Sequence, residues 1–84
     1  MWELKYQPKV LKTLTKLDKQ TSQKIIEYLE KISKDPESFG KPLRADLSGF
    51  WRYRIGKYRI ICDLRKEELI VLIVKIDKRD EVYN

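Results

Sequence analysis

The sequence predicts an α+β fold in which an N-terminal strand and a helical hairpin pack on one face of a mainly antiparallel four-stranded sheet. Two observations indicate this class. Apolar residues recur at helical spacing between residues 8 and 34, whereas residues 50–76 form three β-rich runs joined by short turns. The length of 84 residues indicates a single small domain, 1–84, with one core.

The first half of the chain predicts a short strand followed by two helices. Alternation with charged residues places the strand at Trp2, Leu4 and Tyr6. Pro8 suits the first turn of a helix, and Asp18 is expected to cap a second helix that Asp35-Pro36 ends. The apolar stripe of the first helix consists of Val10, Leu11, Leu14 and Leu17. The stripe of the second consists of Ile25, Ile26, Leu29 and Ile32.

The second half predicts a loop and a three-stranded meander. Residues 37–48 include Gly40 and Pro42 and indicate a loop, with a brief extended piece near residues 43–47. Strands are expected at residues 50–55, 58–64 and 69–76, and the charged residues 65–68 form the turn between the last two.

The most informative stretch is the tight hairpin expected around Gly56-Lys57. A two-residue turn that begins with glycine places Arg54 opposite Arg59. Because side chains alternate across a strand, Arg52, Arg54 and Arg59 share one face. The other face is expected to join the core through Trp51, Tyr53, Ile55, Tyr58 and Ile60. Like charges directly opposite each other destabilise an antiparallel pair, so the arginine face predicts a site for an anion.

The register of the last strand follows from parity, because a one-residue slip exchanges its two faces. The predicted register places Lys75, Asp77 and Arg79 on the open face beside Arg59, since the alternative would bury Lys75. The residues that then face the helices are Ile70, Leu72, Val74 and Ile76. The apolar residues left on the open face are Ile61, Val71 and Ile73. We expect a partner protein or a stacked base to cover them.

Charge and residue usage limit the partners and the chemistry. The chain has 19 basic and 13 acidic residues and a net charge of +6, which favours a polyanionic partner such as nucleic acid or an acidic protein. Histidine is absent, and with a single cysteine no metal site or other cofactor is expected. Cys62 lies in an apolar strand, so we expect it to be a core residue. A single cysteine also leaves no disulfide framework, which indicates a reducing compartment. Without an apolar run of membrane-spanning length or a signal peptide, the protein is expected to be cytoplasmic.

The chain resembles the RelE/ParE toxin superfamily of bacterial type II toxin-antitoxin modules, and more closely its RelE branch. The matching pieces are Leu43-Arg44, residues 47–61 (LSGFWRYRIGKYRII) and residues 76–83 (IDKRDEVY). The expected order of elements is also similar to that family. The resemblance implies a toxin that cleaves messenger RNA on the ribosome, by attack of a ribose 2′-hydroxyl on the adjacent phosphate, and so inhibits translation without a metal ion.

The resemblance also implies which residues act. By position, the catalytic residues are Arg52, Arg54, Arg59, Arg79 and Tyr83. The implied RNA-binding residues are Arg44, Lys57, Lys75 and Lys78. One guanidinium group can bind two phosphate oxygens, and it stabilises the negative charge that develops during the attack. A tyrosine can stack on a base. The implied partners are the ribosome, messenger RNA and a RelB-like cognate antitoxin, with no membrane and with DNA bound only indirectly through the antitoxin.

Two departures from the family pattern predict weak catalysis. Arg52 and Arg54 stand where relatives often have lysines, and arginine stays protonated, so it is a poor base. Lys57, Lys75 or Lys78 could act as the general base only if neighbouring cations favoured its neutral form. Asp77 is an acid beside the expected phosphate site and should weaken anion binding. Two alternatives therefore stay open, a ParE-type inhibitor of DNA gyrase and a catalytically weak toxin-like binding module.

Overall fold

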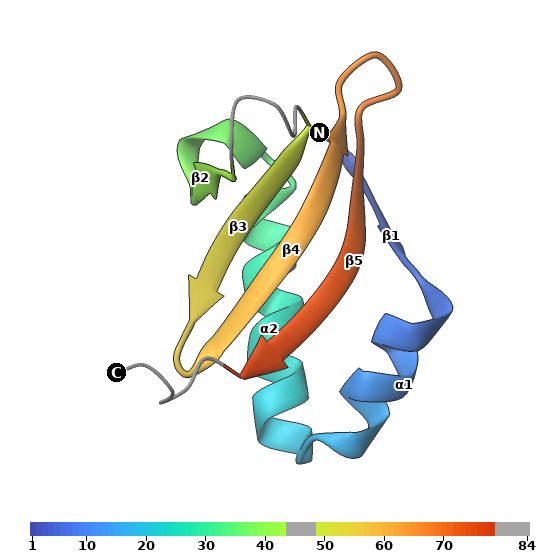
Figure 1. Cartoon of the computed structure of the whole chain (residues 1–84), viewed down its shortest axis with the longest axis vertical. Helices are drawn as coiled ribbons and strands as arrows, with labels where there is room; N and C mark the ends of the chain where they lie inside the picture. The colour runs from blue at the N-terminus through green and yellow to red at the C-terminus, as the bar shows by residue number, and fades with distance from the viewer. Residues whose placement is uncertain (44–48, 79–84) are drawn as a thin grey trace.

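The computed structural model describes residues 1–43 and 49–78, and its elements follow the predicted order. They are β1 (Glu3–Tyr6), α1 (Pro8–Lys16), α2 (Lys19–Ile32), a 3-10 helix (Pro36–Ser38), β2 (Lys41–Pro42), β3 (Phe50–Ile55), β4 (Tyr58–Arg65) and β5 (Ile70–Lys78). The strands form one sheet in the order β1-β5-β4-β3-β2, in which β1 and β5 are parallel and the other neighbours antiparallel (Figure 1). The predicted α+β class is confirmed. Within the described residues, no helix has the length and hydropathy of a membrane span.

The sheet has five strands rather than the four predicted from the sequence. The additional strand, β2, consists of Lys41 and Pro42, which pair with Arg52 and Trp51 of β3. Extended backbone was predicted slightly later, near residues 43–47, most of which lie outside the described residues. A two-residue strand has no alternating pattern, and proline is typical of an edge strand because it has no N–H for the ladder. The sequence therefore gives little indication of β2.

Both helices begin where the sequence predicted. Pro8 is the first residue of α1. The Asp18 carboxylate caps α2 by accepting hydrogen bonds from the Thr21 hydroxyl at 2.6 Å and the Thr21 backbone N–H at 3.3 Å, and these bonds lower the pKa of Asp18. The apolar stripe of α1 is narrower than predicted, because Leu11 is half exposed.

The two helices cover one face of the sheet, and the core lies between the two layers (Figure 1). The buried apolar residues of the helices are Val10, Leu14, Ile25, Leu29 and Ile32. Those of the sheet are Tyr53, Ile60, Cys62, Leu64, Val71, Ile73 and Ile76. Trp51 and Tyr58 pack against this core, as predicted, and the Tyr53 hydroxyl donates a hydrogen bond to the Pro36 carbonyl at 2.9 Å. No described helix covers the opposite face of the sheet, which we call the open face.

A β-bulge interrupts the pairing of β4 with β5. Cys62 of β4 pairs with Ile73, whereas its neighbour Ile61 pairs with Lys75. Val74 is therefore an additional residue in β5 that has no partner of its own in this ladder. Because side chains alternate strictly along a regular strand, one additional residue exchanges the two faces of β5 from this point onward.

The bulge corrects the prediction for the first half of β5. Val71 and Ile73 were expected on the open face beside the arginines, but both are fully buried against the helices. Ile70 and Leu72 were expected to face the helices and instead alternate onto the open face. The prediction was wrong because it assumed that side chains alternate regularly between the two faces along the whole of β5.

Val74 was expected to face the helices but is the bulge residue and is only partly buried. From Lys75 to Asp77 the predicted register is confirmed. Ile76 is buried, while Lys75 is exposed and Asp77 is half-buried on the open face. Asp77 pairs with Arg59 of β4, so the two side chains lie next to each other across the ladder. The bulge therefore allows apolar residues in both halves of β5 to be buried without burying Lys75.

Two glycines with similar backbone conformation test the packing around β2 and β3. Gly40 and Gly56 have φ values of +64° and +58°. A Cβ at Gly40 would collide with the Arg52 carbonyl oxygen and the Tyr53 ring, whereas a Cβ at Gly56 would meet nothing within 4 Å. We expect Gly40→Ala to lower the free energy of unfolding by about 3 kcal/mol or more, and Gly56→Ala by about 1 kcal/mol from its backbone alone. Urea unfolding of both variants measures the difference, and equal losses would contradict this packing.

Candidate functional site

The turn between β3 and β4 has the predicted geometry. Gly56 has a φ of +58° at the first central position, while Lys57 does not have a positive φ, which is the combination of a type II′ turn. Arg54 pairs with Arg59 and Ile55 with Tyr58, as the sequence predicted. The hairpin therefore holds two guanidinium-bearing residues directly opposite each other.

Strand pairing arranges basic residues in two rows across the open face, because residues paired in register share a face. The first row consists of Lys41, Arg52, Ile61 and Lys75. The second row consists of Arg54, Arg59 and Asp77. We call these seven residues the cationic face. It contains five basic side chains and one acidic side chain, so it can attract and hold an anion.

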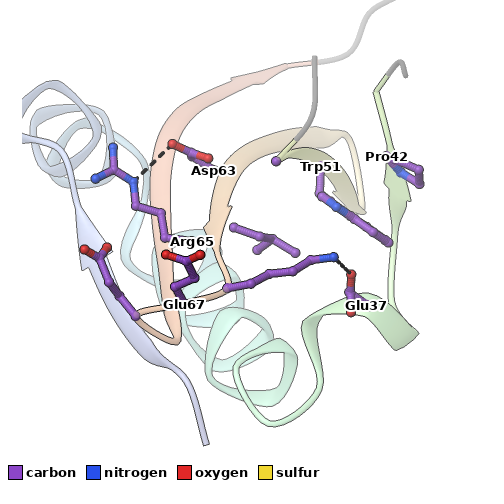
Figure 2. Close-up of a pocket in the computed structure, with 10 residues that line it drawn as sticks. Glu37, Pro42, Trp51, Asp63, Arg65 and Glu67 are labelled. Carbon is purple, nitrogen blue, oxygen red and sulfur yellow. Dashed lines mark hydrogen bonds and ion pairs between the residues drawn. The ribbon is translucent and has the colours of Figure 1, made fainter. Parts of the chain in front are cut away.

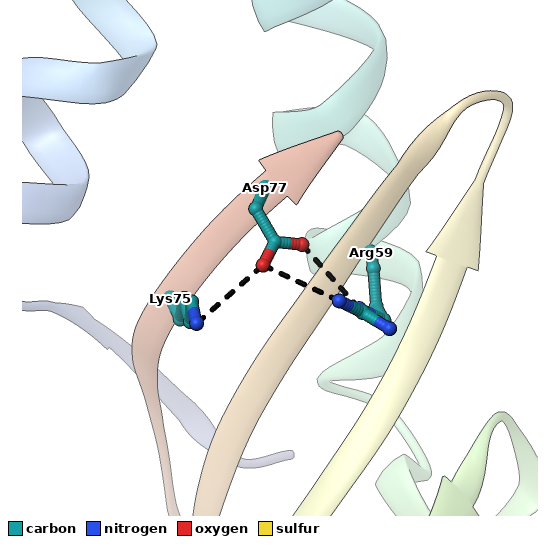
Figure 3. A network of polar contacts seen from close by, with 3 residues as sticks. All are labelled: Arg59, Lys75 and Asp77. Carbon is teal, nitrogen blue, oxygen red and sulfur yellow. Dashed lines mark hydrogen bonds and ion pairs between the residues drawn. The ribbon is translucent and has the colours of Figure 1, made fainter. Parts of the chain in front are cut away.

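Asp77 links two basic side chains of the cationic face (Figure 3). Arg59 donates hydrogen bonds to it from Nε to Oδ1 at 3.3 Å and from Nη2 to Oδ2 at 3.5 Å. The Lys75 ammonium lies 3.5 Å from Oδ2. The side chains of Arg59, Asp77 and Lys75 are 40%, 30% and 59% exposed, so water screens these ion pairs. The acid that the sequence analysis singled out thus contacts Arg59 directly.

The first row ends in a small cavity at the edge of the sheet. Lys41, Arg52 and Arg54 line this cavity of about 290 Å³ together with Tyr28 and Gly40. Within the described part of the chain, neither Lys41 nor Arg52 forms an ion pair. Sequence reasoning missed Lys41 and Tyr28 as site residues, because their proximity to Arg52 depends on the pairing of β2 with β3 and on the packing of α2.

The other predicted site residues lie elsewhere or outside the described residues. Lys57 and Lys78 line a separate pocket of about 480 Å³ near the hairpin turn, which α2 completes with Thr21, Lys24 and Ile25. The structure therefore gathers Arg52, Arg54, Arg59 and Lys75 on one face but does not bring these two lysines onto it. Arg44, Arg79 and Tyr83 lie outside the described residues.

A larger cavity of about 660 Å³ lies near the turn between β4 and β5 (Figure 2). Its walls contain four carboxylates, those of Glu37, Asp63, Glu67 and Glu68, and two cations, Arg65 and Lys66. The two cations are already paired, Arg65 with Asp63 at 3.2 Å and Lys66 with Glu37 at 2.8 Å. Because acidic groups outnumber basic ones here, this cavity does not suit a phosphate.

The described residues support anion binding more directly than proton transfer. Histidine is absent from the chain, and no three metal-ligating side chains gather within residues 1–43 and 49–78. Burial raises the pKa of Cys62, and the nearby charge of Asp63 adds to this effect, so the thiol stays protonated. A lysine was expected to act as a base only if its neighbours were cations. Lys75 instead lies beside the carboxylate of Asp77. The arginines can bind phosphate oxygens and stabilise negative charge.

Comparisons with known proteins give matches over most of the chain. A family model for the ParE toxin of the type II toxin-antitoxin system, parDE, matches residues 4–83. RelE4 of Methanocaldococcus jannaschii is 30% identical over 87 aligned positions, which cover 99% of this chain and 92% of RelE4. Toxin RelG of Mycobacterium tuberculosis is 36% identical over 52 residues, so the match spans 62% of this chain and only 60% of RelG.

A solved structure has the same fold. In the toxin-antitoxin complex RelBE2 from Mycobacterium tuberculosis, one chain superposes with a TM-score of 0.82 at 28% sequence identity. The match covers 93% of this chain and 98% of that one. The arrangement of two helices on one face of a mainly antiparallel sheet is therefore shared with a toxin-antitoxin protein over nearly its whole length.

The thiol of Cys62 tests whether the sheet beneath the cationic face is packed as described. Cys62 is fully buried, and its raised pKa keeps it from forming the reactive thiolate. We expect the native protein to react with a thiol-specific chromogenic disulfide at pH 8 at least about 100-fold more slowly than the protein unfolded in guanidinium, because reaction requires opening of the core. Rapid labelling of the native protein would show that Cys62 is accessible.

Proposed function

Because this chain belongs to the RelE/ParE family of toxins of type II toxin-antitoxin systems, we propose that it inhibits translation by cleaving messenger RNA on the ribosome. One observation supports the proposal above all. Arg54 and Arg59 face each other across the hairpin, with Arg52 on the same open face. Facing like charges cost stability in a sheet. Asp77 already offsets part of the charge of Arg59, and a phosphodiester bound between the two arginines would offset more of this repulsion.

In the proposed reaction, the ribose 2′-oxygen attacks the adjacent phosphorus while the bond from phosphorus to the 5′-oxygen breaks. The products are a 2′,3′-cyclic phosphate and a 5′-hydroxyl, whose oxygen takes up a proton from water as it leaves. Arg52, Arg54 and Arg59 bind the non-bridging oxygens and stabilise the charge that accumulates there. Since arginine does not accept a proton, the 2′-hydroxyl proton passes to water or to a group of the ribosomal RNA. The protein thus contributes position and electrostatics.

The other site residues predicted from the sequence complete this proposal. Arg79 is proposed as a further phosphate-binding residue, and Tyr83 as the side chain that stacks on a base or orients the 2′-hydroxyl. Arg44, Lys57, Lys75 and Lys78 are proposed to contact the RNA backbone. A ribosomal substrate implies that the protein acts in the cytoplasm.

We also propose a cognate antitoxin of the RelB type as partner. The similar protein of Mycobacterium tuberculosis was solved as a toxin-antitoxin complex. An acidic antitoxin segment that covers the cationic face would neutralise the same side chains that bind RNA. Neutralisation and substrate binding would then exclude each other.

Cleavage of messages on purified ribosomes tests the enzymatic proposal. We expect cuts within translated messages, and a loss of about 100-fold or more in rate for Arg59→Ala, because one charge-stabilising group is removed. Arg65→Ala is the matched control: Arg65 lies on the same strand, is paired with Asp63 and is not part of the cationic face. Messages that stay intact with the wild-type protein, or equal losses in both variants, would reject the proposed mechanism.

A second candidate function is inhibition of DNA gyrase, as in toxins of the ParE type. Two observations favour it. The matching family model describes a ParE toxin. In addition, three of the basic residues of the cationic face are arginines, which cannot act as a general base because they do not accept a proton. Inhibition by binding, unlike cleavage of RNA, requires no general base.

Supercoiling of relaxed plasmid by purified gyrase separates the two functions. The nuclease proposal predicts unchanged supercoiling together with cleaved messages. Loss of supercoiling, with messages intact and a DNA-damage response in cells, would support gyrase inhibition instead. Normal growth after expression without the antitoxin would favour the third alternative, a toxin-like module that only binds.

A further inference from the structure

The ion-pair network around Asp77 suggests how the site selects its substrate. We propose that Asp77 competes with the substrate phosphate for Arg59 and so makes the site discriminate against isolated phosphodiesters. This inference rests on the proposed binding of RNA by the cationic face. It assigns to Asp77 the role of a specificity-determining residue that acts through Arg59.

The geometry of the pair supports competition. Arg59 uses Nε and Nη2, one edge of its guanidinium group, to bind both carboxylate oxygens of Asp77. A phosphate binds arginine in the same two-pronged way, so the carboxylate occupies donors that a phosphodiester would use. Strong bonds between charged groups measure about 2.7 to 2.9 Å, whereas these measure 3.3 and 3.5 Å. Both side chains are also partly exposed. The pair is therefore loose enough for a substrate to displace.

The charge of Asp77 also opposes phosphate binding at Arg59. Asp77 offsets part of the positive charge of both Arg59 and Lys75. A phosphate that approaches Arg59 also meets repulsion from the carboxylate. By contrast, Lys41 and Arg52 form no ion pair within the described residues. Binding should therefore begin at the Lys41 and Arg52 end of the face.

The consequence is a requirement for several contacts at once. A single phosphodiester has to compete with Asp77 for Arg59 without help from any other contact. A strand that already contacts Lys41 and Arg52 presents its next phosphate to Arg59 at high effective concentration. RNA held in a fixed path, as on a ribosome, meets this requirement better than free RNA does, because its conformational freedom has already been lost.

The chain supplies a matched control for Asp77. Asp63 of β4 lies on the same open face and forms the same kind of ion pair, with Arg65 Nε at 3.2 Å. It is not part of the cationic face, since its partners across the sheet are Phe50 and Leu72. Asp63→Asn and Asp77→Asn therefore change the net charge and the shape of the side chain equally. They differ in the cations that they release, Arg65 for Asp63 and both Arg59 and Lys75 for Asp77.

The test measures binding of a fluorescent 12-nucleotide RNA, made uncleavable by 2′-O-methylation, to the purified protein without ribosomes. We expect Asp77→Asn to bind this RNA about three- to tenfold more tightly than the wild type, and Asp63→Asn to stay within twofold. In an Arg59→Ala background, Asp77→Asn should give no such gain. The slope of log affinity against log salt should become steeper by about 0.7 in Asp77→Asn, as expected for one further phosphate contact on a single strand.

The remaining outcomes are distinguishable. Equal affinities of Asp77→Asn and Asp63→Asn would overturn the role of Asp77, because overall charge would then explain the result. A gain that persists without Arg59 would overturn its action through Arg59, because overall charge or the release of Lys75 would then explain the gain. Asp77→Gly repeats the measurement with the side chain removed, and thermal unfolding checks that each variant is folded. The proposed nuclease function fails separately, if the wild-type protein leaves ribosome-bound messages uncut.

Discussion

Burial of one face of the β3–β4 hairpin is the interaction on which the site depends. Tyr53 and Ile60 pair with each other and are fully buried against the helices. Their burial fixes the register, since a one-residue slip would move the buried side chains to water and the arginines into the core. With that register, Arg52, Arg54 and Arg59 must lie together on the open face. Burial of the core thus holds the three arginines together on one face, although their mutual repulsion opposes this arrangement.

The bulge at Val74 connects this core to the electrostatics of the site. It lets Ile73 and Ile76 both face the helices, although they are three residues apart. The same shift places Asp77 opposite Arg59, where the two side chains form an ion pair. A local irregularity that improves packing on one side of the sheet therefore determines which charges meet on the other.

The cationic face has the charge to bind an anion but little capacity for proton transfer. Guanidinium groups are always charged and suit the phosphate group of RNA, but they do not act as bases. The chain belongs to a toxin family of type II toxin-antitoxin systems. In the function that we propose, the ribosome positions the message and the protein stabilises charge. In the same proposal, Asp77 would weaken the binding of RNA that the ribosome does not hold, because it pairs with Arg59.

The sequence by itself determined the features that depend on neighbours in the chain: the start of α1 at Pro8, the cap at Asp18, and a glycine turn that sets Arg54 opposite Arg59. These follow from helical spacing, capping chemistry and the alternation of short strands, which act over a few residues. Only the tertiary structure decided the edge strand β2, the change of face within β5 and the contact of Asp77 with Arg59. Each of these depends on which backbone groups pair across the sheet, and an additional residue in one strand leaves no mark on local periodicity until its partner strand is known.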